Sequence, residues 1–279
     1  MAITAQDVNR LRKATGAGMM DCKKALTEAG GDFDAAVDFL RKKGQKVSAK
    51  RADREAKEGA IFINANADNT EAVLIELNCE TDFVARNEDF IALGNGIAAV
   101  AGSEKPADVT ALKALSLDGT EINEALTNAM GKIGEKLDVS KYEKINGDSI
   151  VSYIHPGSRV GVVVAFEGST SGNLAAVGKD VAMQIAAMKP VALDKDGVDQ
   201  AIIDKEIEIG KEQARESGKP DNIVEKIAMG KLNKFFKEQT LLNQDFVKDT
   251  SKSVSKYIKD ELGADICVKD FKLLVLGAS

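Results

Sequence analysis

The stretch GAIFINANADNTEAVLIELNCETDFVARNEDF, residues 59–90, decides how this chain is organised, because two apolar runs, a turn and a helix start follow one another in it. Residues 59–78 predict a β-hairpin that turns at Asn66–Asn69. Alternate residues of the second run are apolar, which predicts a strand with one buried face: Val73, Ile75, Leu77 and Cys79.

Phe83 follows this strand, and the sequence leaves two interpretations of it open. A helix that starts at Thr81 would place Phe83, Phe90 and Ile97 on one buried stripe. A helix that starts after Asn87, a good N-cap, would leave TDFVAR as a separate turn and Phe83 off the stripe. The residues alone favour a core position over burial in another protein.

Upstream, residues 1–44 predict three short helices joined by glycine-containing turns. The first ends in the turn 15–18, the second spans about 20–28, and the third runs from its N-cap Asp32 to Gly44. Three helices of this size form a miniature bundle close to the lower size limit for independent folding.

Met19 and Met20 stand beside the glycine-rich turn of this bundle. Methionine is a flexible filler of cores, and it is equally suited to adaptable contact surfaces. Adjacent residues cannot both lie on one helix face, so we expect at least one of the two to be exposed.

A basic run, RKKGQKVSAKRADREAK (41–57), carries eight Lys and Arg residues against two acids. Such a run can bind nucleic acid. However, it has no aromatic residue for base stacking, and the whole chain has a net charge of −6. We therefore expect residues 45–57 to be a solvated linker, with no direct nucleic-acid partner.

Downstream, a second hairpin (147–168) turns at His155-Pro156-Gly157-Ser158 and is followed by a helix, as the first hairpin is. A last helix leads into a terminal strand, Ile266–Leu276. Hairpins with helices gathered beside them indicate an α+β fold with mainly antiparallel sheets. The predicted core has two related halves, which are residues 58–139 for the first, and 140–193 with 239–279 for the second.

Residues 194–238 interrupt the second half with two charged helices broken by SGKPDN. Their apolar stripes are narrow, which predicts an antiparallel helical hairpin. Such a hairpin either projects, to pack on a partner or on a second copy in a homodimer, or lies flat on the body. The sequence leaves both arrangements open.

Composition places the chain among ordinary soluble proteins, at 279 residues with 44% hydrophobic and 29% charged residues. No apolar run reaches the length of a membrane span, and the first residues lack the pattern of a signal peptide. The three cysteines are odd in number and widely spaced, which indicates a reducing cytoplasm. We expect a cytoplasmic protein without a membrane partner.

Catalytic motifs are absent from the sequence. It contains one histidine, His155, no GxxxxGK[ST] loop, and neither GxSxG nor HExxH. His155 would be the natural acid or base of an enzyme, but no nucleophile or metal-ligand set accompanies it. The sequence therefore predicts no catalytic residue, no metal site and no cofactor.

Two segments, LRKATGAGMMDCKKAL (11–26) and ELNCETDFVAR (76–86), resemble the signatures of the elongation factor Ts family. The similarity continues through SYIHPGSRVGVVVA, ESGKPDNIVEKI and LLNQDFV and covers nearly the whole chain. The resemblance implies a ubiquitin-associated-like (UBA-like) three-helix domain, a linker, a core of two related antiparallel-sheet and helix halves, and an inserted coiled-coil hairpin.

The resemblance also implies a function. Members of this family bind the GTPase elongation factor Tu and loosen its GDP so that GTP can enter, without any covalent change. By resemblance, Asp82 and Phe83 enter the GTPase near its magnesium and phosphate site. The residues that correspond to partner contacts are Thr81, Asp82, Phe83, Val84, Arg12, Met19, Met20, Lys23, Ile133, Gly134, His155 and Val247.

The sequence departs from the family pattern at Pro156, which interrupts the usual His-Gly run, and at Lys248, where a relative has methionine. The rival interpretation is a non-catalytic adaptor that binds partners through its UBA-like bundle. The TDFVAR turn distinguishes the two, because an adaptor has no use for it.

Overall fold

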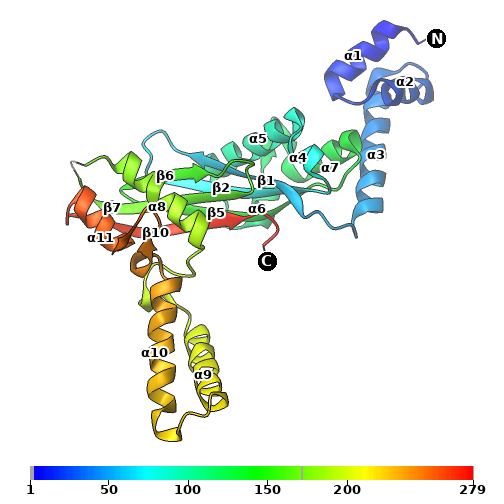
Figure 1. Cartoon of the computed structure of the whole chain (residues 1–279). Coiled ribbons are helices and arrows are strands. Elements are labelled where there is room, and N and C mark those ends of the chain that lie inside the picture. Colours follow the sequence, from blue (N-terminus) through cyan, green and yellow to red (C-terminus); the bar gives the residue numbers. More distant parts are fainter. Residues whose placement is uncertain (1–2, 171, 279) are drawn as a thin grey trace.

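Two three-stranded antiparallel sheets form the centre of the molecule (Figure 1). The computed structural model describes residues 3–170 and 172–278. The first sheet has the strand order β1 (Glu58–Ala65), β2 (Glu71–Cys79) and β5 (Asp138–Asn146). The second has the order β10 (Ile266–Val275), β7 (Val160–Gly168) and β6 (Ser149–Ile154). Both predicted hairpins are therefore confirmed.

Helices cover the outer face of each sheet, so the body has four layers. On the first sheet lie α5 (Glu88–Glu104) and α7 (Ile122–Ile133), and on the second lie α8 (Leu174–Met188) and α11 (Val254–Leu262). The inner faces of the two sheets pack on each other. This mixture of helices and antiparallel sheets confirms the α+β class.

The prediction that the second strand buries one face is wrong, because β2 is buried on both. Val73, Ile75, Leu77 and Cys79 face the helices, while Ala72 and Leu74 face the second sheet. The central strand of a sheet enclosed between two layers has no solvent side. The alternation in the sequence therefore indicates only the more apolar face of β2, which packs against the helices.

The strand β5 was not predicted, and it shows that the first sheet extends to Asn146. β5 pairs with β2 from Glu71–Asn146 to Asn78–Asp138, so the predicted boundary between residues 139 and 140 falls inside this strand. Its segment DVSKYEKIN is an edge strand with mostly half-buried or exposed residues. Its hydrophobic pattern is therefore too weak to mark a strand.

Three helices form the N-terminal bundle: α1 (Ala5–Thr15), α2 (Met19–Glu28) and α3 (Phe33–Arg51). The predicted end of the third helix at Gly44 is wrong, because α3 continues for nearly two more turns. Gly44 is buried where α3 crosses α7, and a Cβ on Gly131 would lie 2.8 Å from the Gly44 Cα. The glycine permits a close helix crossing, and part of the expected linker is helical.

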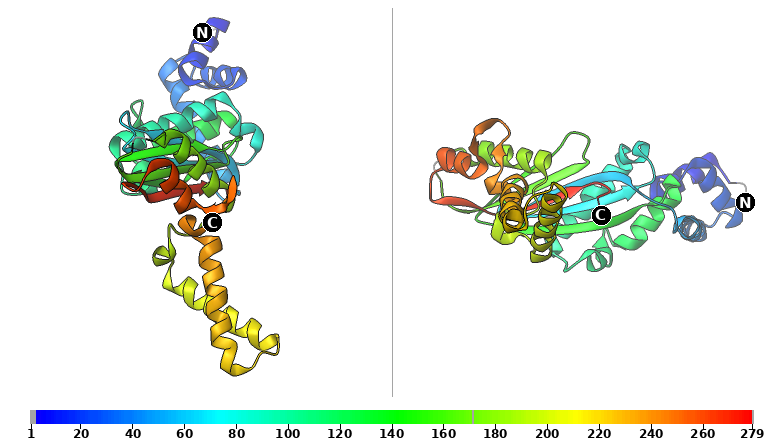
Figure 2. Two further views of the ribbon diagram at one scale, coloured as in Figure 1. Left: turned by 60° about the vertical axis from the view of Figure 1, so that its left-hand side comes forward. Right: turned by 60° about the horizontal axis from the view of Figure 1, so that its bottom comes forward.

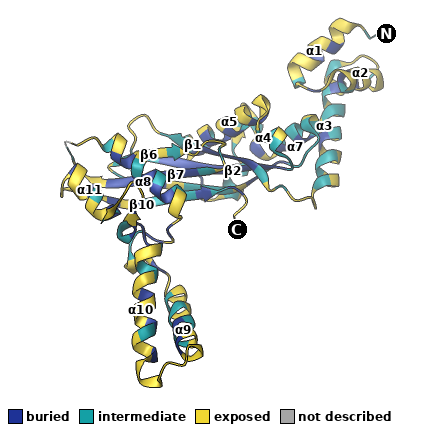
Figure 3. Cartoon of the chain, viewed as in Figure 1, coloured by how far each residue is buried: buried dark blue, intermediate teal, exposed yellow. Residues whose placement is uncertain are grey.

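The helical hairpin consists of α9 (Gln200–Glu216) and α10 (Asp221–Gln239), and it projects away from the body (Figures 1 and 2). Its outer faces are exposed, and a narrow buried seam joins the two helices (Figure 3). At this seam a Cβ on Gly210 would lie 3.0 Å from the Ala228 Cα, so the backbones approach closely. The projecting arrangement is thus the observed one.

Short elements complete the fold. They are α4 (Asp82–Ala85), α6 (Val109–Lys113), the strand pairs β3 (Ser116–Leu117) with β4 (Thr120–Glu121) and β8 (Asp245–Phe246) with β9 (Asp249–Ser253), and the 3-10 turns η1 (Lys195–Gly197) and η2 (Leu241–Asn243). Of these, α4 carries Phe83.

Candidate functional site

Phe83 projects into solvent from α4, a helical turn between β2 and α5. Its side chain is 82% exposed, the largest exposure of any large apolar residue that the structure describes. The neighbouring Val84 and Ala85 pack against the core of the first half. The turn is therefore anchored on one side and presents an isolated aromatic ring on the other.

Helix α5 begins after Asn87, whose side chain accepts a hydrogen bond from the Asp89 N–H at 2.8 Å. Asn87 thus separates α4 from α5, and Phe83 does not join the stripe of Phe90 and Ile97, which are both fully buried. Of the two interpretations of Phe83, the exposed position is the correct one, although the residues alone favoured the core.

Asp82 lies beside the ring and forms an ion pair with Arg86, with 2.9 Å between Oδ2 and Nη2. Both side chains are substantially exposed, at 46% and 78%. Exposed pairs of this spacing contribute about 0.3–0.5 kcal/mol. The carboxylate of Asp82 is thus easily released to another partner.

Glu135 anchors the start of the turn from the loop that follows α7. Its carboxylate accepts hydrogen bonds from the Thr81 N–H at 3.0 Å, the Thr81 hydroxyl at 2.7 Å and the Glu80 N–H at 3.2 Å. Thr81 is also the N-cap of α4, and its Oγ1 accepts from the Val84 N–H at 3.5 Å. These bonds fix the backbone from which Phe83 projects.

Glu80, the residue before Thr81, links the same turn to the end of α3 and to the loop after α7. Its carboxylate accepts from Arg51 Nη1 at 2.6 Å, Arg54 Nη1 at 3.2 Å and the Lys136 N–H at 2.7 Å. Burial alone would raise the pKa of Glu80, but the bonds from Lys136 and the two arginines outweigh it and lower the pKa. The end of α3 is therefore tied to the Phe83 turn, and this part of the basic run is not a freely solvated linker.

Cys79 lies directly behind the turn and is fully buried. Its thiol donates to the Thr81 carbonyl at 3.0 Å. Burial, followed by the negative charge of Glu135, raises the pKa of the Cys79 thiol to about 12. A protonated, buried thiol is neither a nucleophile nor a metal ligand.

A groove of about 500 Å³ opens beside Asp82 and Arg86 and reaches the turn of the second hairpin. Ile91 and Ile154 line it and are 40% and 41% exposed. The sequence interpretation missed both. Ile91 lies outside the buried stripe of α5 and belongs to no motif. Its exposure as an apolar residue is therefore visible only in the folded structure.

His155 occupies the first position of the second hairpin turn, where the Ser158 N–H donates to its carbonyl at 2.9 Å. The Ser158 carbonyl in turn accepts from the Ile61 N–H of β1 at 2.8 Å. This bond brings the hairpin turn of the second half to the groove of the first. The His155 ring is exposed, and its Nδ1 lies 2.8 Å from the Tyr153 hydroxyl.

Ile133 and Gly134 end α7 immediately before Glu135, so they adjoin the Phe83 turn. Gly134 adopts a left-handed conformation with φ of 83° and caps the helix, while Ile133 is half-buried against the core. Val247 lies further away, in the second half, where its N–H donates to Gln184 of α8 at 2.9 Å. Its side chain is 46% exposed.

The remaining predicted contact residues lie on the N-terminal bundle. Met19 and Met20 are 56% and 74% exposed at the start of α2. Arg12 and Lys23 are exposed as well. Both methionines are thus surface residues, which agrees with the expectation that at least one would be.

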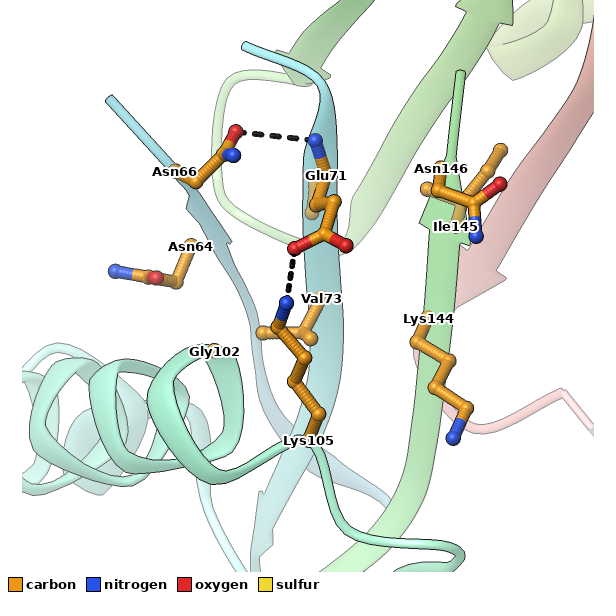
Figure 4. Close-up of a pocket in the computed structure, with 10 residues that line it drawn as sticks. Asn64, Asn66, Glu71, Val73, Gly102, Lys105, Lys144, Ile145 and Asn146 are labelled. Atoms are coloured by element: carbon orange, nitrogen blue, oxygen red, sulfur yellow. Dashed lines mark hydrogen bonds and ion pairs between the residues drawn. The ribbon is translucent and has the colours of Figure 1, made fainter. Parts of the chain in front are cut away.

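A second depression, of about 240 Å³, lies at the far end of the β1–β2 hairpin (Figure 4). Lys105 and Glu71 form an ion pair across it, and Asn66 accepts from the Glu71 N–H at 3.0 Å. None of the predicted site residues lines it. Of its polar lining residues, Asn66, Glu71 and Lys105 interact with one another.

Within residues 3–170 and 172–278, no group of three His, Cys, Asp or Glu side chains could hold a metal ion. Over the same residues, no helix has the length and apolar character needed to cross a membrane.

The chain is similar over its whole length to known proteins. The family model described as Elongation factor TS matches residues 80–278. A protein named Elongation factor Ts from Amoebophilus asiaticus is 49% identical over 278 residues, covering 100% of both chains. Proteins of the same name from Cytophaga hutchinsonii and Porphyromonas gingivalis are 54% and 47% identical, with 92% and 100% of each chain covered. The chain therefore belongs to the elongation factor Ts family.

Proposed function

We propose that this chain binds elongation factor Tu in its GDP-bound form and promotes the release of GDP, so that GTP can enter. Family membership supports the partner, because this is the activity that the resemblance implies. The observation that carries the mechanism is the 82% exposure of Phe83 on a turn that is fixed to the body. In the proposed complex, Asp82 and Phe83 insert near the magnesium and phosphate site of the GTPase.

The ring acts as a wedge. Burial of a phenyl side chain contributes about 1.5–3 kcal/mol, which is roughly tenfold or more in an equilibrium constant. A packed interior shifts rather than compresses, so a rigid ring that enters it displaces a neighbouring element. The adjacent Asp82 carboxylate suits a helix N-terminus or a basic group of the partner.

The energy of one ring does not displace the nucleotide alone, so the rest of the surface must contribute. The additional contacts that we propose are made by Arg12, Met19, Met20, Lys23, Thr81, Val84, Ile133, Gly134, His155 and Val247. All of them have exposed or half-buried positions. The turn from His155 to Ser158 reaches the same groove as Asp82, which supports one continuous surface over the two halves.

Exchange of this kind needs no acid, base or cofactor of the chain's own, because its work is differential binding. The chain must bind the nucleotide-free GTPase more tightly than the GDP-bound form. By linkage, bound GDP must lower the affinity of the GTPase for the chain by the same ratio as the chain lowers its affinity for GDP. We accordingly propose that the chain is not an enzyme, acts in the cytoplasm and holds no cofactor. The magnesium and GDP on which it acts belong to the partner.

Two structural parts of the proposal follow from the family resemblance. We propose that the N-terminal bundle is UBA-like, and that α9 and α10 form a coiled coil. The exposed outer faces of the projecting hairpin leave a homodimer as a further prediction, with a concentration-dependent mass as its measurement.

The rival function is a non-catalytic adaptor that uses its bundle alone. The fixed, exposed turn with Phe83 favours the exchange factor, because the bundle of an adaptor would work without it.

One experiment tests the proposal. Elongation factor Tu is loaded with a fluorescent GDP, and its release is followed with and without this chain in the presence of excess unlabelled GDP. We expect substoichiometric amounts of the chain to accelerate the release of all the labelled nucleotide. Binding without acceleration would favour the adaptor, and an unchanged trace without binding would remove elongation factor Tu as the partner.

A further inference from the structure

Two half-buried carboxylates, those of Glu80 and Glu135, lie beside the proposed contact surface, at a point where three segments distant in the sequence come together. These segments are the end of α3 with the residues that follow it, the residues between β2 and α4, and the loop after α7. Each of them leads directly to a part of the proposed surface. They lead to the N-terminal bundle, the Phe83 turn and the Ile133–Gly134 loop respectively.

Glu80 and Glu135 each bind the backbone of the segment that carries the other. The Glu135 carboxylate accepts from the N–H groups of Glu80 and Thr81 at 3.2 and 3.0 Å. The Glu80 carboxylate accepts from the N–H of Lys136, the residue after Glu135, at 2.7 Å. The loop after α7 and the start of the Phe83 turn are therefore fastened together at both sides.

The same junction holds the N-terminal bundle. Arg51, the last residue of α3, and Arg54 donate to the two oxygens of Glu80 at 2.6 and 3.2 Å. The Lys136 ammonium donates to the backbone carbonyls of Ala52 and Arg54 at 2.6 and 2.9 Å. The chain that leaves α3 thus contacts the junction through both side chain and backbone.

Both carboxylates are engaged in hydrogen bonds within the chain. The Glu80 side chain is only 12% exposed, and both of its oxygens accept from arginines of its own chain. Glu135 uses both oxygens on Glu80 and Thr81. Asp82, two residues from Glu80, is 46% exposed, as a contact residue should be.

We propose that Glu80 and Glu135 are positioning residues that hold the Phe83 turn, the Ile133–Gly134 loop and the N-terminal bundle in one arrangement. The role in nucleotide exchange rests on the function proposed above. Groups that are already ordered lose less conformational freedom on binding, so more of the contact energy of a preorganised turn is available to displace an element of the partner. A flexible turn would still allow the chain to bind its partner. However, the turn itself would move when the Phe83 ring contacts the packed interior of the partner.

Glu135 can be tested with a graded pair of substitutions. Glu135→Ala removes all three hydrogen bonds to the turn. Glu135→Gln keeps them, because its amide oxygen can accept from the two N–H groups and its amide nitrogen can donate to the Thr81 hydroxyl. Glu124→Ala is the matched control, since Glu124 is an acid of α7 that makes a surface ion pair with Arg41 and does not contact the turn.

The first measurement is amide hydrogen exchange of the free protein, which needs no partner. In Glu135→Ala we expect the amides of residues 80–86 to exchange at least about tenfold faster, while those of β2 and α5 keep their rates. Glu135→Gln should stay near the parent, and Glu124→Ala should not change this segment. Glu80→Ala should instead accelerate exchange at the end of α3, because Thr81 remains bound to Glu135.

The second measurement is GDP release from elongation factor Tu as a function of the concentration of each variant. We expect Glu135→Ala to lower the maximal release rate about tenfold with a much smaller change in the half-saturating concentration, and Glu135→Gln to restore most of it. Amide hydrogen exchange at residues 80–86 that is unchanged in Glu135→Ala would overturn the proposal. So would a release rate that falls only in proportion to the folded fraction of Glu135→Ala.

Failure of the proposed function gives a different pattern. In that case the unmodified chain itself does not accelerate GDP release. The hydrogen-exchange measurement then still decides whether the two carboxylates hold the turn.

Discussion

The Phe83 turn and the start of α2 both present apolar side chains to solvent, but the chain holds them differently. Thr81 caps the Phe83 turn, Glu135 binds Thr81, and Val84 packs into the core behind it. Helix α2 begins after Gly18, which offers no side-chain cap, and carries Met19 and Met20. One region is a stiff ring on a fixed base, whereas the other consists of flexible side chains at an uncapped helix start.

For the proposed contact surface, this difference predicts two separate tasks. A ring with few rotatable bonds on a fixed turn keeps its position when it contacts a partner, so it can displace a packed element there. Methionine side chains are unbranched and polarisable, so they adapt to whatever surface they meet. We therefore expect the Phe83 turn to govern the rate of nucleotide release and the methionine pair to govern the affinity of the complex.

The largest expected effect separates Phe83 from Phe90, the same residue type seven positions later. Phe83→Ala should slow the GDP release from elongation factor Tu that the chain stimulates by about an order of magnitude and leave the melting temperature nearly unchanged, because the ring is exposed. Phe90→Ala, at a fully buried position, should lower the free energy of unfolding by about 3–5 kcal/mol. Stopped-flow release and thermal unfolding of both variants check this. A large loss of stability in Phe83→Ala would return the ring to the core.

The next effect tests the methionine pair. Replacing Met19 and Met20 together with alanine should weaken complex formation several-fold, by about 1–2 kcal/mol, while the stability of the free chain hardly changes. Titration calorimetry with elongation factor Tu measures the affinity. Met130→Ala is the control, since this side chain is buried and should cost about 2–5 kcal/mol of stability. Equal losses of affinity and stability in the double variant would place the methionines in the bundle core.

A smaller effect tests the base of the wedge. Thr81→Val removes the N-cap acceptor of α4 and the hydroxyl bound to Glu135 while keeping the shape of the side chain. The loss of a cap costs about 1 kcal/mol, so we expect the release rate to fall by roughly twofold to fivefold. Thr127→Val, which removes a hydroxyl bonded to the Asn123 carbonyl within α7, should stimulate GDP release from the partner at the parent rate. Equal rates in the two variants would contradict a fixed turn.

The smallest effect concerns pH. The pKa of Glu80 is lowered from its ordinary value of 4.5, so the ionised form favours the folded state. Its contribution is complete above about pH 4.5 and is lost as the pH falls through the folded pKa. Denaturant unfolding of the parent and of Glu80→Gln should therefore give a stability difference that shrinks as the pH falls below about 4.5. A difference that grows towards acid pH would mean that the carboxylate is not stabilised by its partners.

Local signals in the sequence were sufficient for most elements of the fold. The cap at Asn87, the turn residues 66–69 and the turn at His155 predicted element boundaries that the structure confirms. These signals are strong because they act through hydrogen bonds and backbone dihedral angles of neighbouring residues. The membership of the family followed from motifs in the same way, without knowledge of where any side chain points.

The failures have a common cause, which is contact between segments that are distant in the chain. Gly44 has the sequence pattern of a helix stop, but α7 packs against it and makes it a crossing point. The polar strand β5 exists because β2 offers it an edge. Glu80 and Glu135 carry no signal of their own, since an acid in a charged segment is ordinarily solvated. Hydrogen bonding across 55 residues, from the Glu80 N–H to the Glu135 carboxylate, gives them a role.

The amino-acid sequence by itself thus determined the class of the fold, the spans of most helices and strands and the family, because these depend on local conformational preference and on motif identity. The exposure of Phe83, the carboxylate junction beneath it and the projection of the helical hairpin were decided only by the tertiary structure. Burial is a property of what surrounds a residue. Those surroundings come from segments that become neighbours only when the chain has folded.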